Sequence, residues 1–349
     1  MKIGVLTGGG DCPGLNAVIR GLVYKATKEY GHEVVGFKYG WKGPIENITM
    51  PLDLDEINDI VREGGTILKS SRTNPFNVDG APEKIVENLK ANGFDALVAI
   101  GGEDTCGVAS KLYEQFGINV IGVPKTIDND LSGTDVTFGF DSCINIATEL
   151  VDILHTTACS HERALVVEAM GRHAGWIASY TGIAGNADYI LVPEEKVDVN
   201  ELCDAVKAAY AKKKYAIVVA AEGAKLSGED VTKDAELDAF GHVKLGGIGE
   251  HLAKVIEEKT GIETRSAVFG HTQRGGRPSA MDRVLGTRFG CKAADMIQDK
   301  EFGKMAALIG NDMKAVDLKV AVGTLKTLDM SIHENAKIFF GAYKSKVKA

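Results

Sequence analysis

The sequence lacks several features that would place it in other classes of protein. No stretch approaches the roughly 20 consecutive apolar residues that a membrane-spanning helix needs, and the first residues enter a strand pattern without a signal-peptide flank. The six cysteines are scattered, with no C-x-x-C pair. That spacing disfavours zinc sites and disulfides, and it predicts buried thiols in a reducing compartment. We expect a cytoplasmic protein with no membrane partner.

An excess of basic charge is also missing. Forty Lys and Arg residues face 48 Asp and Glu residues, a formal net charge of −8, which argues against nucleic acid as a partner. The motifs G-x-x-x-x-G-K-[ST], H-E-x-x-H and G-x-S-x-G do not occur, which disfavours P-loop NTPases, common metalloproteases and α/β-hydrolases. Pro13 stands where a dinucleotide fingerprint would have its last glycine, so a dehydrogenase is disfavoured as well.

The chain does contain a regular alternation of short β-branched runs and helical patterns. Its 349 residues, 44% hydrophobic and 25% charged, suit two moderate globular domains or one large one. Strand patterns occupy residues 3–7, 96–100, 119–123, 164–168, 189–192 and 215–221. The alternation predicts an α/β fold with mainly parallel sheets covered by helices on both faces, in two Rossmann-like lobes.

Parallel sheets bind ligands beyond the carboxyl ends of their strands, and the chemically notable residues follow strands here. Residues 8–16 read GGGDCPGLN and open a helix, which suits a phosphate but equally suits a tight turn. Residues 101–105 read GGEDT, where adjacent carboxylates either hold Mg²⁺ or cap a helix. Residues 124–130 read PKTIDND and place an amine, a hydroxyl and two aspartates within one loop.

Three further strand ends carry arginine, histidine or glutamate next to glycine. They read MGRHAG at 170–175, AEG at 221–223 and GHTQRGG at 270–276. Arginine and histidine in glycine-rich turns are the groups that recognise a phosphate ester at short range. Each motif alone is a modest signal.

In their order along the chain, these motifs resemble the phosphofructokinase family from Lys2 to Phe339-Phe340-Gly341. The resemblance implies phosphorylation of fructose 6-phosphate at O1, with Mg²⁺ as cofactor held through Glu103. It implies an active cleft between a donor lobe at 1–140 plus about 275–322 and a sugar lobe at 141–274 plus about 323–349.

The resemblance also assigns roles to individual residues. Asp128 takes the proton from the sugar 1-hydroxyl, and Arg172 stabilises the transferring phosphoryl group. The phosphoryl donor is contacted by Gly10, Arg72, Asp104 and Lys125. The remaining sugar-phosphate ligands are Thr126, Asp130, Met170, Gly171, Glu222, His271 and Arg274.

Two further ligands, Arg163 and Arg265, would reach the sugar 6-phosphate from a neighbouring subunit. This resemblance therefore implies a homodimer or homotetramer.

The donor is decided by two positions where ATP-using bacterial members of the family have glycine. Here Asp104 fills the space of a nucleotide's α-phosphate and sets a negative charge beside it, at a cost of roughly 4 kcal/mol for unit charges at ~4 Å and an effective dielectric near 20. Lys125 can hold pyrophosphate instead. In the family this pair accompanies pyrophosphate, so we expect a reversible, pyrophosphate-dependent enzyme of glycolysis or gluconeogenesis; an ATP-dependent 6-phosphofructokinase is the alternative.

Other readings explain less of the sequence. An NAD-kinase or lipid-kinase relative accounts for GGEDT but not for TIDND or the His-x-x-Arg at 271–274. A regulatory, non-catalytic chain would lack Asp128 or Arg172, and both are present.

Overall fold

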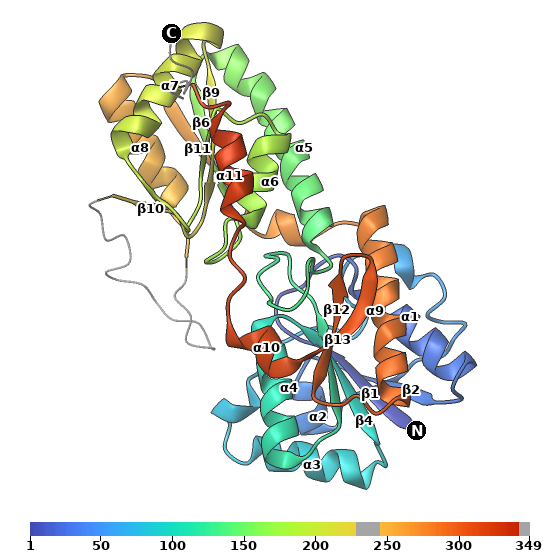
Figure 1. The fold of residues 1–349 in the computed structure, drawn as a ribbon. Helices are drawn as coiled ribbons and strands as arrows, with labels where there is room; N and C mark the ends of the chain where they lie inside the picture. Colours follow the sequence, from blue (N-terminus) through green and yellow to red (C-terminus); the bar gives the residue numbers. More distant parts are fainter. Residues whose placement is uncertain (228–244, 342–349) are drawn as a thin grey trace. The chain divides into compact units, whose positions relative to one another are not determined.

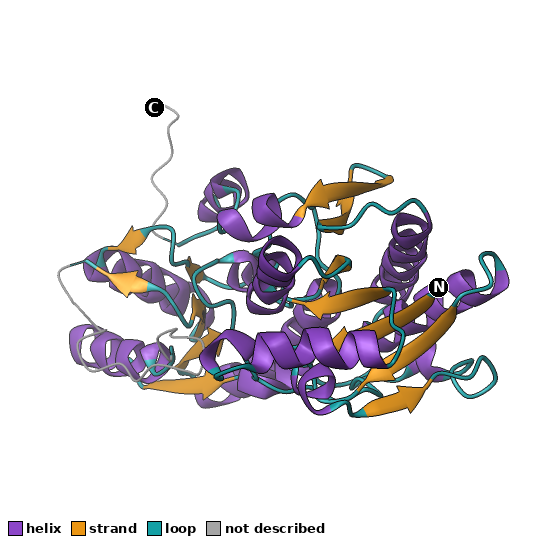
Figure 2. Cartoon of the chain, turned by 90° about the horizontal axis from the view of Figure 1, so that it is seen from below, coloured by secondary structure: helices purple, strands orange, loops and turns teal. Residues whose placement is uncertain are grey.

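The computed structural model describes residues 1–227 and 245–341 and divides the chain into two compact units. Within the described residues, unit 1 comprises 1–142 and 274–326, and unit 2 comprises 143–227, 245–273 and 327–341. Parts of the predicted sugar lobe, at 228–244 and 342–349, lie outside the described residues. The predicted α/β fold is confirmed: both units contain mostly parallel sheets with helices beside them (Figure 1, Figure 2).

Unit 1 is built on a seven-stranded sheet with the order β13-β12-β5-β4-β1-β2-β3. Its strands are β1 (Lys2–Thr7), β2 (Glu33–Phe37), β3 (Thr49–Pro51), β4 (Ala96–Gly101), β5 (Val120–Pro124), β12 (Lys304–Ile309) and β13 (Asp312–Asp317). The five inner strands run parallel, and only the edge strands β3 and β13 pair antiparallel. Strands β4 and β5 are buried along their whole length, as central parallel strands covered on both faces must be.

The helices of unit 1 cover both faces of this sheet. They are α1 (Leu15–Lys28), α2 (Lys42–Glu46), α3 (Ala81–Ala91), α4 (Glu103–Phe116), α9 (Ala280–Gln298) and α10 (Leu318–Gly323), with short 3₁₀ turns at Ile60–Arg62 and Pro75–Asn77. Helices α1 and α9 pack together on one side, and α3, α4 and α10 lie on the other (Figure 1). The α1–α9 contact is close because Gly290 has no side chain where it meets the backbone of Val18.

Unit 2 contains a four-stranded, fully parallel sheet with the order β11-β6-β9-β7. These strands are β6 (Ala164–Ala169), β7 (Tyr189–Leu191), β9 (Ala216–Ala221) and β11 (Thr264–Val268); β8 (Lys196–Val197) and β10 (Lys225–Leu226) form a separate pair. The helices are α5 (Phe140–His161), α6 (Trp176–Ala184), α7 (Val199–Lys213), α8 (Ile248–Thr260) and α11 (Met330–Lys337), and the turn η3 (Gly270–Arg274) follows β11. Helices α7 and α8 pack beside each other (Figure 1).

The prediction of buried cysteines is correct for four positions and wrong for two. Cys12, Cys106, Cys143 and Cys203 are buried, whereas Cys159 is exposed and Cys291 is half-buried. Cys159 lies in the last turn of α5, where the side chain faces away from the core of its unit. Among the helices of residues 1–227 and 245–341, none is both long and apolar enough to cross a membrane.

Candidate active site

Three loops of unit 1 begin at the carboxyl ends of neighbouring strands, all at the same end of the sheet. Thr7 of β1 lies in register with Ile100 of β4, and Gly101 of β4 lies in register with Pro124 of β5. Strand β1 lies between β2, which follows it in the chain, and β4, so the strand order reverses direction beside β1. Such a reversal separates the two following loops and is where open α/β sheets bind ligands.

Lys125, directly after β5, reaches across this edge to the first loop. Its side chain is buried, and Nζ donates a hydrogen bond of 2.6 Å to the carbonyl oxygen of Gly10. Burial lowers the pKa of Lys125, and the nearby Arg274 lowers it further, while Cys12 and Asp128 oppose this shift. An anion bound beside this ammonium group would replace lost solvation and favour its charged form.

Arg274 also lies against the first loop. A Cβ atom on Gly10 would lie 2.6 Å from Nη1 of Arg274, and Nη1 donates a 3.4 Å hydrogen bond to the carbonyl oxygen of Asp11. Glycine at position 10 is therefore needed for this close approach. In this structure Arg274 belongs to unit 1, whereas His271, predicted to act with it on the sugar phosphate, is an exposed residue of unit 2. Their joint role stays a prediction.

Arg72 follows a segment that is hydrogen-bonded to the same loop. The backbone N–H of Gly9 donates to the carbonyl oxygen of Ser71, and the hydroxyl of Ser70 donates to the carbonyl oxygen of Gly9. Arg72 itself is exposed. The structure thus brings Lys125 and Arg274 to the loop of Gly10, and Arg72 follows a segment bonded to that loop.

The two carboxylates predicted for donor selection and metal binding occupy the first turn of α4. Glu103 and Asp104 are both half-buried there. A Cβ atom on Gly102 would lie 3.4 Å from the carbonyl oxygen of Lys125, so the start of α4 borders the loop after β5. Across the described residues, no three His, Cys, Asp or Glu side chains form a metal cluster. Mg²⁺ commonly takes one or two carboxylates plus water and substrate phosphate, which this set of donors fits.

Asp128 is held in place by one oxygen and leaves the other available. The hydroxyl of Thr126 donates to Oδ2 of Asp128 at 3.3 Å, and the backbone N–H of Asp128 donates to that hydroxyl at 3.0 Å. Asp128 is only 4% exposed, yet its Oδ1 has no hydrogen-bond partner within the part of the chain that the structure describes. A buried carboxylate oxygen without a donor is costly, and a substrate hydroxyl would satisfy it. Asp130 is buried in the same loop.

The carboxyl edge of the sheet in unit 2 gathers a second group of predicted residues. Ala169 of β6 and Ala221 of β9 end in register, so Met170 and Glu222 leave the sheet side by side. The side chain of Glu222 accepts a 2.9 Å hydrogen bond from the backbone N–H of Arg172. Arg172 has a left-handed backbone (φ 54°), as does Gly171 (φ 140°), so the turn after β6 is sharp.

Arg163 and Arg265 lie at the opposite end of that sheet, where its strands begin. Arg163 directly precedes β6, and Arg265 is the second residue of β11, both at the amino ends of the strands. Glu263 forms ion pairs with both, at 3.3 Å from Arg163 Nη2 and 2.8 Å from Arg265 Nη2. Within unit 2 these arginines are therefore separated from Met170, Arg172 and Glu222 by the length of the strands.

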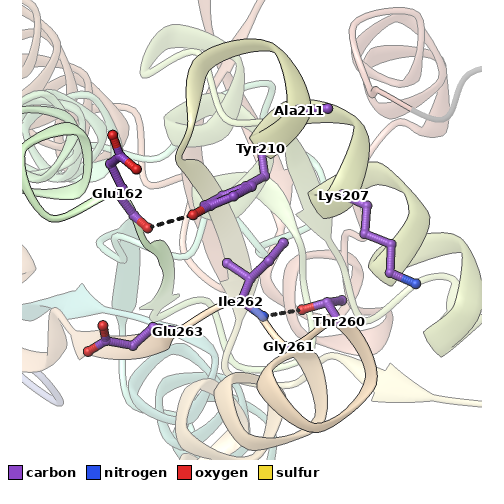
Figure 3. Close-up of a pocket in the computed structure, with 8 residues that line it drawn as sticks. All are labelled: Glu162, Lys207, Tyr210, Ala211, Thr260, Gly261, Ile262 and Glu263. Atoms are coloured by element: carbon purple, nitrogen blue, oxygen red, sulfur yellow. Dashed lines mark hydrogen bonds between the residues drawn. The ribbon is translucent and has the colours of Figure 1, made fainter.

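A pocket of about 710 Å³ occupies this amino edge (Figure 3). It is lined by Glu162, Lys207, Tyr210, Ala211, Thr260, Gly261, Ile262 and Glu263. Tyr210 closes one side by donating a hydrogen bond of 3.2 Å to the carbonyl oxygen of Glu162. None of the predicted catalytic residues lines this pocket.

Two residues without a predicted role also contact the candidate site residues. Gln273, which is fully buried, accepts from the backbone N–H of Met170 through Oε1 at 3.0 Å. Lys326 donates from Nζ to Asn129 Oδ1 at 3.1 Å, within the loop of Asp128. Gln273 lies in the GHTQRGG motif and could have been noticed there. Lys326 has no motif around it.

The α/β fold carries loops, a buried carboxylate and arginines at the carboxyl ends of its parallel strands, as expected for an enzyme that transfers phosphoryl groups. The chain belongs to the phosphofructokinase family, whose model, described as "Phosphofructokinase", matches residues 2–297.

Relatives with assigned names differ in their phosphoryl donor. The chain is 55% identical over 342 residues, covering 98% of it and 100% of the relative, to the pyrophosphate--fructose 6-phosphate 1-phosphotransferase of Streptomyces coelicolor. It is 49% identical over 330 residues, covering 94% of it and 96% of the relative, to ATP-dependent 6-phosphofructokinase 3 of the same organism.

A solved structure supports the fold. The structure of Pichia pastoris phosphofructokinase in the T-state matches with a TM-score of 0.80 at 30% identity, over 92% of this chain. The match covers 35% of the Pichia chain, so this chain spans about a third of that relative's length.

Proposed function

We propose that this chain transfers a phosphoryl group from pyrophosphate to O1 of fructose 6-phosphate, giving fructose 1,6-bisphosphate and phosphate, in a reversible reaction. The single observation that carries the donor assignment is Asp104, a carboxylate in the first turn of α4, which borders the loop of the buried cation Lys125. The 55% identical relative of Streptomyces coelicolor carries the corresponding name.

Asp104 supplies the discrimination against a nucleotide. A pyrophosphate ion ends at its second phosphorus, whereas ATP continues into an α-phosphate, a ribose and a base. A carboxylate in the first turn of α4 occupies the continuation and repels its charge by roughly 4 kcal/mol at ~4 Å and an effective dielectric near 20. Lys125 on the other side attracts the compact anion.

Glu103 would hold Mg²⁺ together with water and the phosphate oxygens of the donor. The metal supplies neutralisation of charge on the transferring group. Glu103 is half-buried at the start of α4, which leaves part of its side chain accessible to solvent.

The protein groups would then act on the attacking hydroxyl and on the phosphate charge. Asp128 accepts the proton of the sugar 1-hydroxyl through Oδ1, while Thr126 fixes Oδ2. Arg172 and Lys125 stabilise the negative charge that spreads over the phosphoryl oxygens in the transition state. Glu222 fixes the backbone of Arg172, so the turn that carries this guanidinium is set before substrate arrives.

The sugar phosphate would be bound by groups from more than one chain. Met170, Gly171 and Glu222 line the carboxyl edge of the sheet in unit 2, and His271 and Arg274 belong to the following turn η3. Arg163 and Arg265, at the opposite edge of the same sheet, would serve the site of a neighbouring subunit. Their separation from Met170 within one chain supports a homodimer or homotetramer as the active form.

An ATP-dependent 6-phosphofructokinase is the second candidate, because the 49% identical relative bears that name. Both candidates are tested by ³¹P NMR of purified protein with fructose 6-phosphate, Mg²⁺ and either donor. We expect pyrophosphate to disappear while phosphate and the 1-phosphate signal of fructose 1,6-bisphosphate appear, and we expect the reverse reaction from product and phosphate. Formation of the bisphosphate with ATP alone would assign the second function.

A further inference from the structure

The loop that carries Asp128 is held from outside by the last residues of unit 1. Leu325 pairs with Leu131 in an antiparallel bridge. The hydroxyl of Ser132 donates to the carbonyl oxygen of Thr324 at 2.6 Å. The backbone N–H of Lys326 donates to the carbonyl oxygen of Asp130 at 2.9 Å. Residues 324–326 thus form a short strap along residues 130–132. The strap ends where the chain passes into unit 2 at Thr327.

The side chain of Lys326 extends this strap into the centre of the loop. Nζ donates to Asn129 Oδ1 at 3.1 Å and to the carbonyl oxygens of Thr134 at 3.0 Å and Asp135 at 2.6 Å. An ammonium group has three N–H donors, and here three oxygens accept them. Deprotonation would leave one of these oxygens facing a lone pair.

Asn129 is the residue through which this contact reaches Asp128. It has a left-handed backbone (φ 52°) between Asp128 and Asp130, and its Oδ1 also accepts from the backbone N–H of Thr137 at 3.1 Å. A non-glycine residue keeps that conformation only when its surroundings fix it. Lys326 and Thr137 together fix the Asn129 side chain, and the direction in which the chain leaves Asp128 depends on it.

We propose that Lys326 is a positioning residue that holds the Asp128–Asp130 loop in its reactive geometry and releases it when the ammonium group loses its proton. This inference rests on the proposed function for the role of Asp128. It makes residues 324–326 part of the structure that positions the proposed catalytic base.

The electrostatic surroundings of Lys326 set the pH at which release occurs. Burial lowers the pKa of Lys326 to about 8, against opposing effects of Asp135 and Asp130, two of the three carboxylates of the loop. Leu308 of β12 and Gly310 after it, which bond to Thr134 and Asp135 from the other side, add no titratable side chain. The ammonium form therefore predominates at neutral pH and is lost over about one pH unit on either side of pH 8.

The test compares Lys326→Met and Lys326→Arg with the matched control Lys319→Met. Lys319 is an exposed lysine of α10 whose only role in the described structure is a surface ion pair with Glu114. In Lys326→Met we expect kcat at pH 7 to fall about tenfold or more, since small misplacement of a catalytic group is costly, with both KM values within about threefold of wild type. Lys319→Met should match the wild type.

The pH profile separates positioning from general support of the fold. Wild-type kcat should fall with a midpoint near pH 8. The guanidinium group of Lys326→Arg stays charged. In this variant the fall of kcat at alkaline pH should therefore occur more than about one pH unit higher than in the wild type. If kcat of Lys326→Arg falls at the same pH as kcat of the wild type, the proposal is overturned. The fall would then belong to another group, and Lys125 is the first candidate.

A stability measurement makes the test independent of turnover. Between pH 8 and 10.5 the unfolded chain retains the Lys326 proton that the folded chain has lost, so the folding stability of the wild type should rise with pH relative to Lys326→Arg. Activity and stability thus change in opposite directions. Equal slopes of melting temperature against pH would contradict the lowered pKa of Lys326 and with it the release step, whereas a wild type inactive with both donors would refute only the proposed function.

Discussion

The ammonium group of Lys125 donates a hydrogen bond of 2.6 Å to the carbonyl oxygen of Gly10, joining the loop after β5 to the loop after β1. Within the described residues the printed hydrogen bond of this buried lysine goes to a neutral carbonyl, and burial lowers its pKa. An anion at the same edge would supply the missing partner. In the proposed function, Lys125 thus links the fold of the sheet to the choice of donor.

Replacing Lys125 by methionine should therefore weaken the use of pyrophosphate. We expect kcat/KM for pyrophosphate to fall about a hundredfold, as when one preorganised donor to a developing charge is removed. Lys314→Met, which removes an exposed lysine of β13, is the control. Initial rates at varied pyrophosphate would measure both variants, and equal losses in both would contradict the assignment.

Replacing Asp128 by asparagine should leave the loop folded but remove the base. We expect kcat to fall about 10²- to 10⁴-fold, the usual contribution of general base catalysis, with KM for fructose 6-phosphate changed by less than about threefold. The exposed Asp312→Asn variant provides the comparison. Turnover that survives in Asp128→Asn would show that another group accepts the proton.

Mixing two inactive variants tests whether arginines act across subunits. If the site of one chain uses its own Asp128 and its neighbour's Arg163, co-refolded Asp128→Asn and Arg163→Ala chains regain about a quarter of the wild-type sites, since one pairing in four is intact. The same recovery is expected with Arg265→Ala. If each site is built from one chain, no mixture recovers, and specific activity after refolding distinguishes the two cases.

Sequence patterns predicted the sheets and their carboxyl-end loops because those depend on local periodicity. The strand expected at 96–100 is Ala96–Gly101 in the structure, and the carboxylates expected after it begin α4. The placement of Asp128 beside Thr126 is likewise local, with the two residues hydrogen-bonded two positions apart.

Contacts between distant segments could not be read from such patterns. Lys326 contacts Asn129 across 197 positions, and only the return of the chain along the sheet brings them together. Arg274 lies within the predicted motif, yet its contact with Gly10 and Asp11 depends on the same return. Cys159 of α5 is exposed because it lies outside the helix face that its unit covers. Residue type alone does not reveal which face of a helix is covered.

The exclusion of nucleotide by the side chain at position 104 is tested most directly by the ratio of kcat/KM for pyrophosphate to that for ATP, in the wild type, Asp104→Asn and Asp104→Gly. Asparagine removes charge and keeps size, whereas glycine removes both. We predict a ratio far above one in the wild type, a lower ratio in Asp104→Asn and a further fall in Asp104→Gly through gained ATP activity. A wild-type enzyme that turns over ATP efficiently and pyrophosphate not at all would contradict this account.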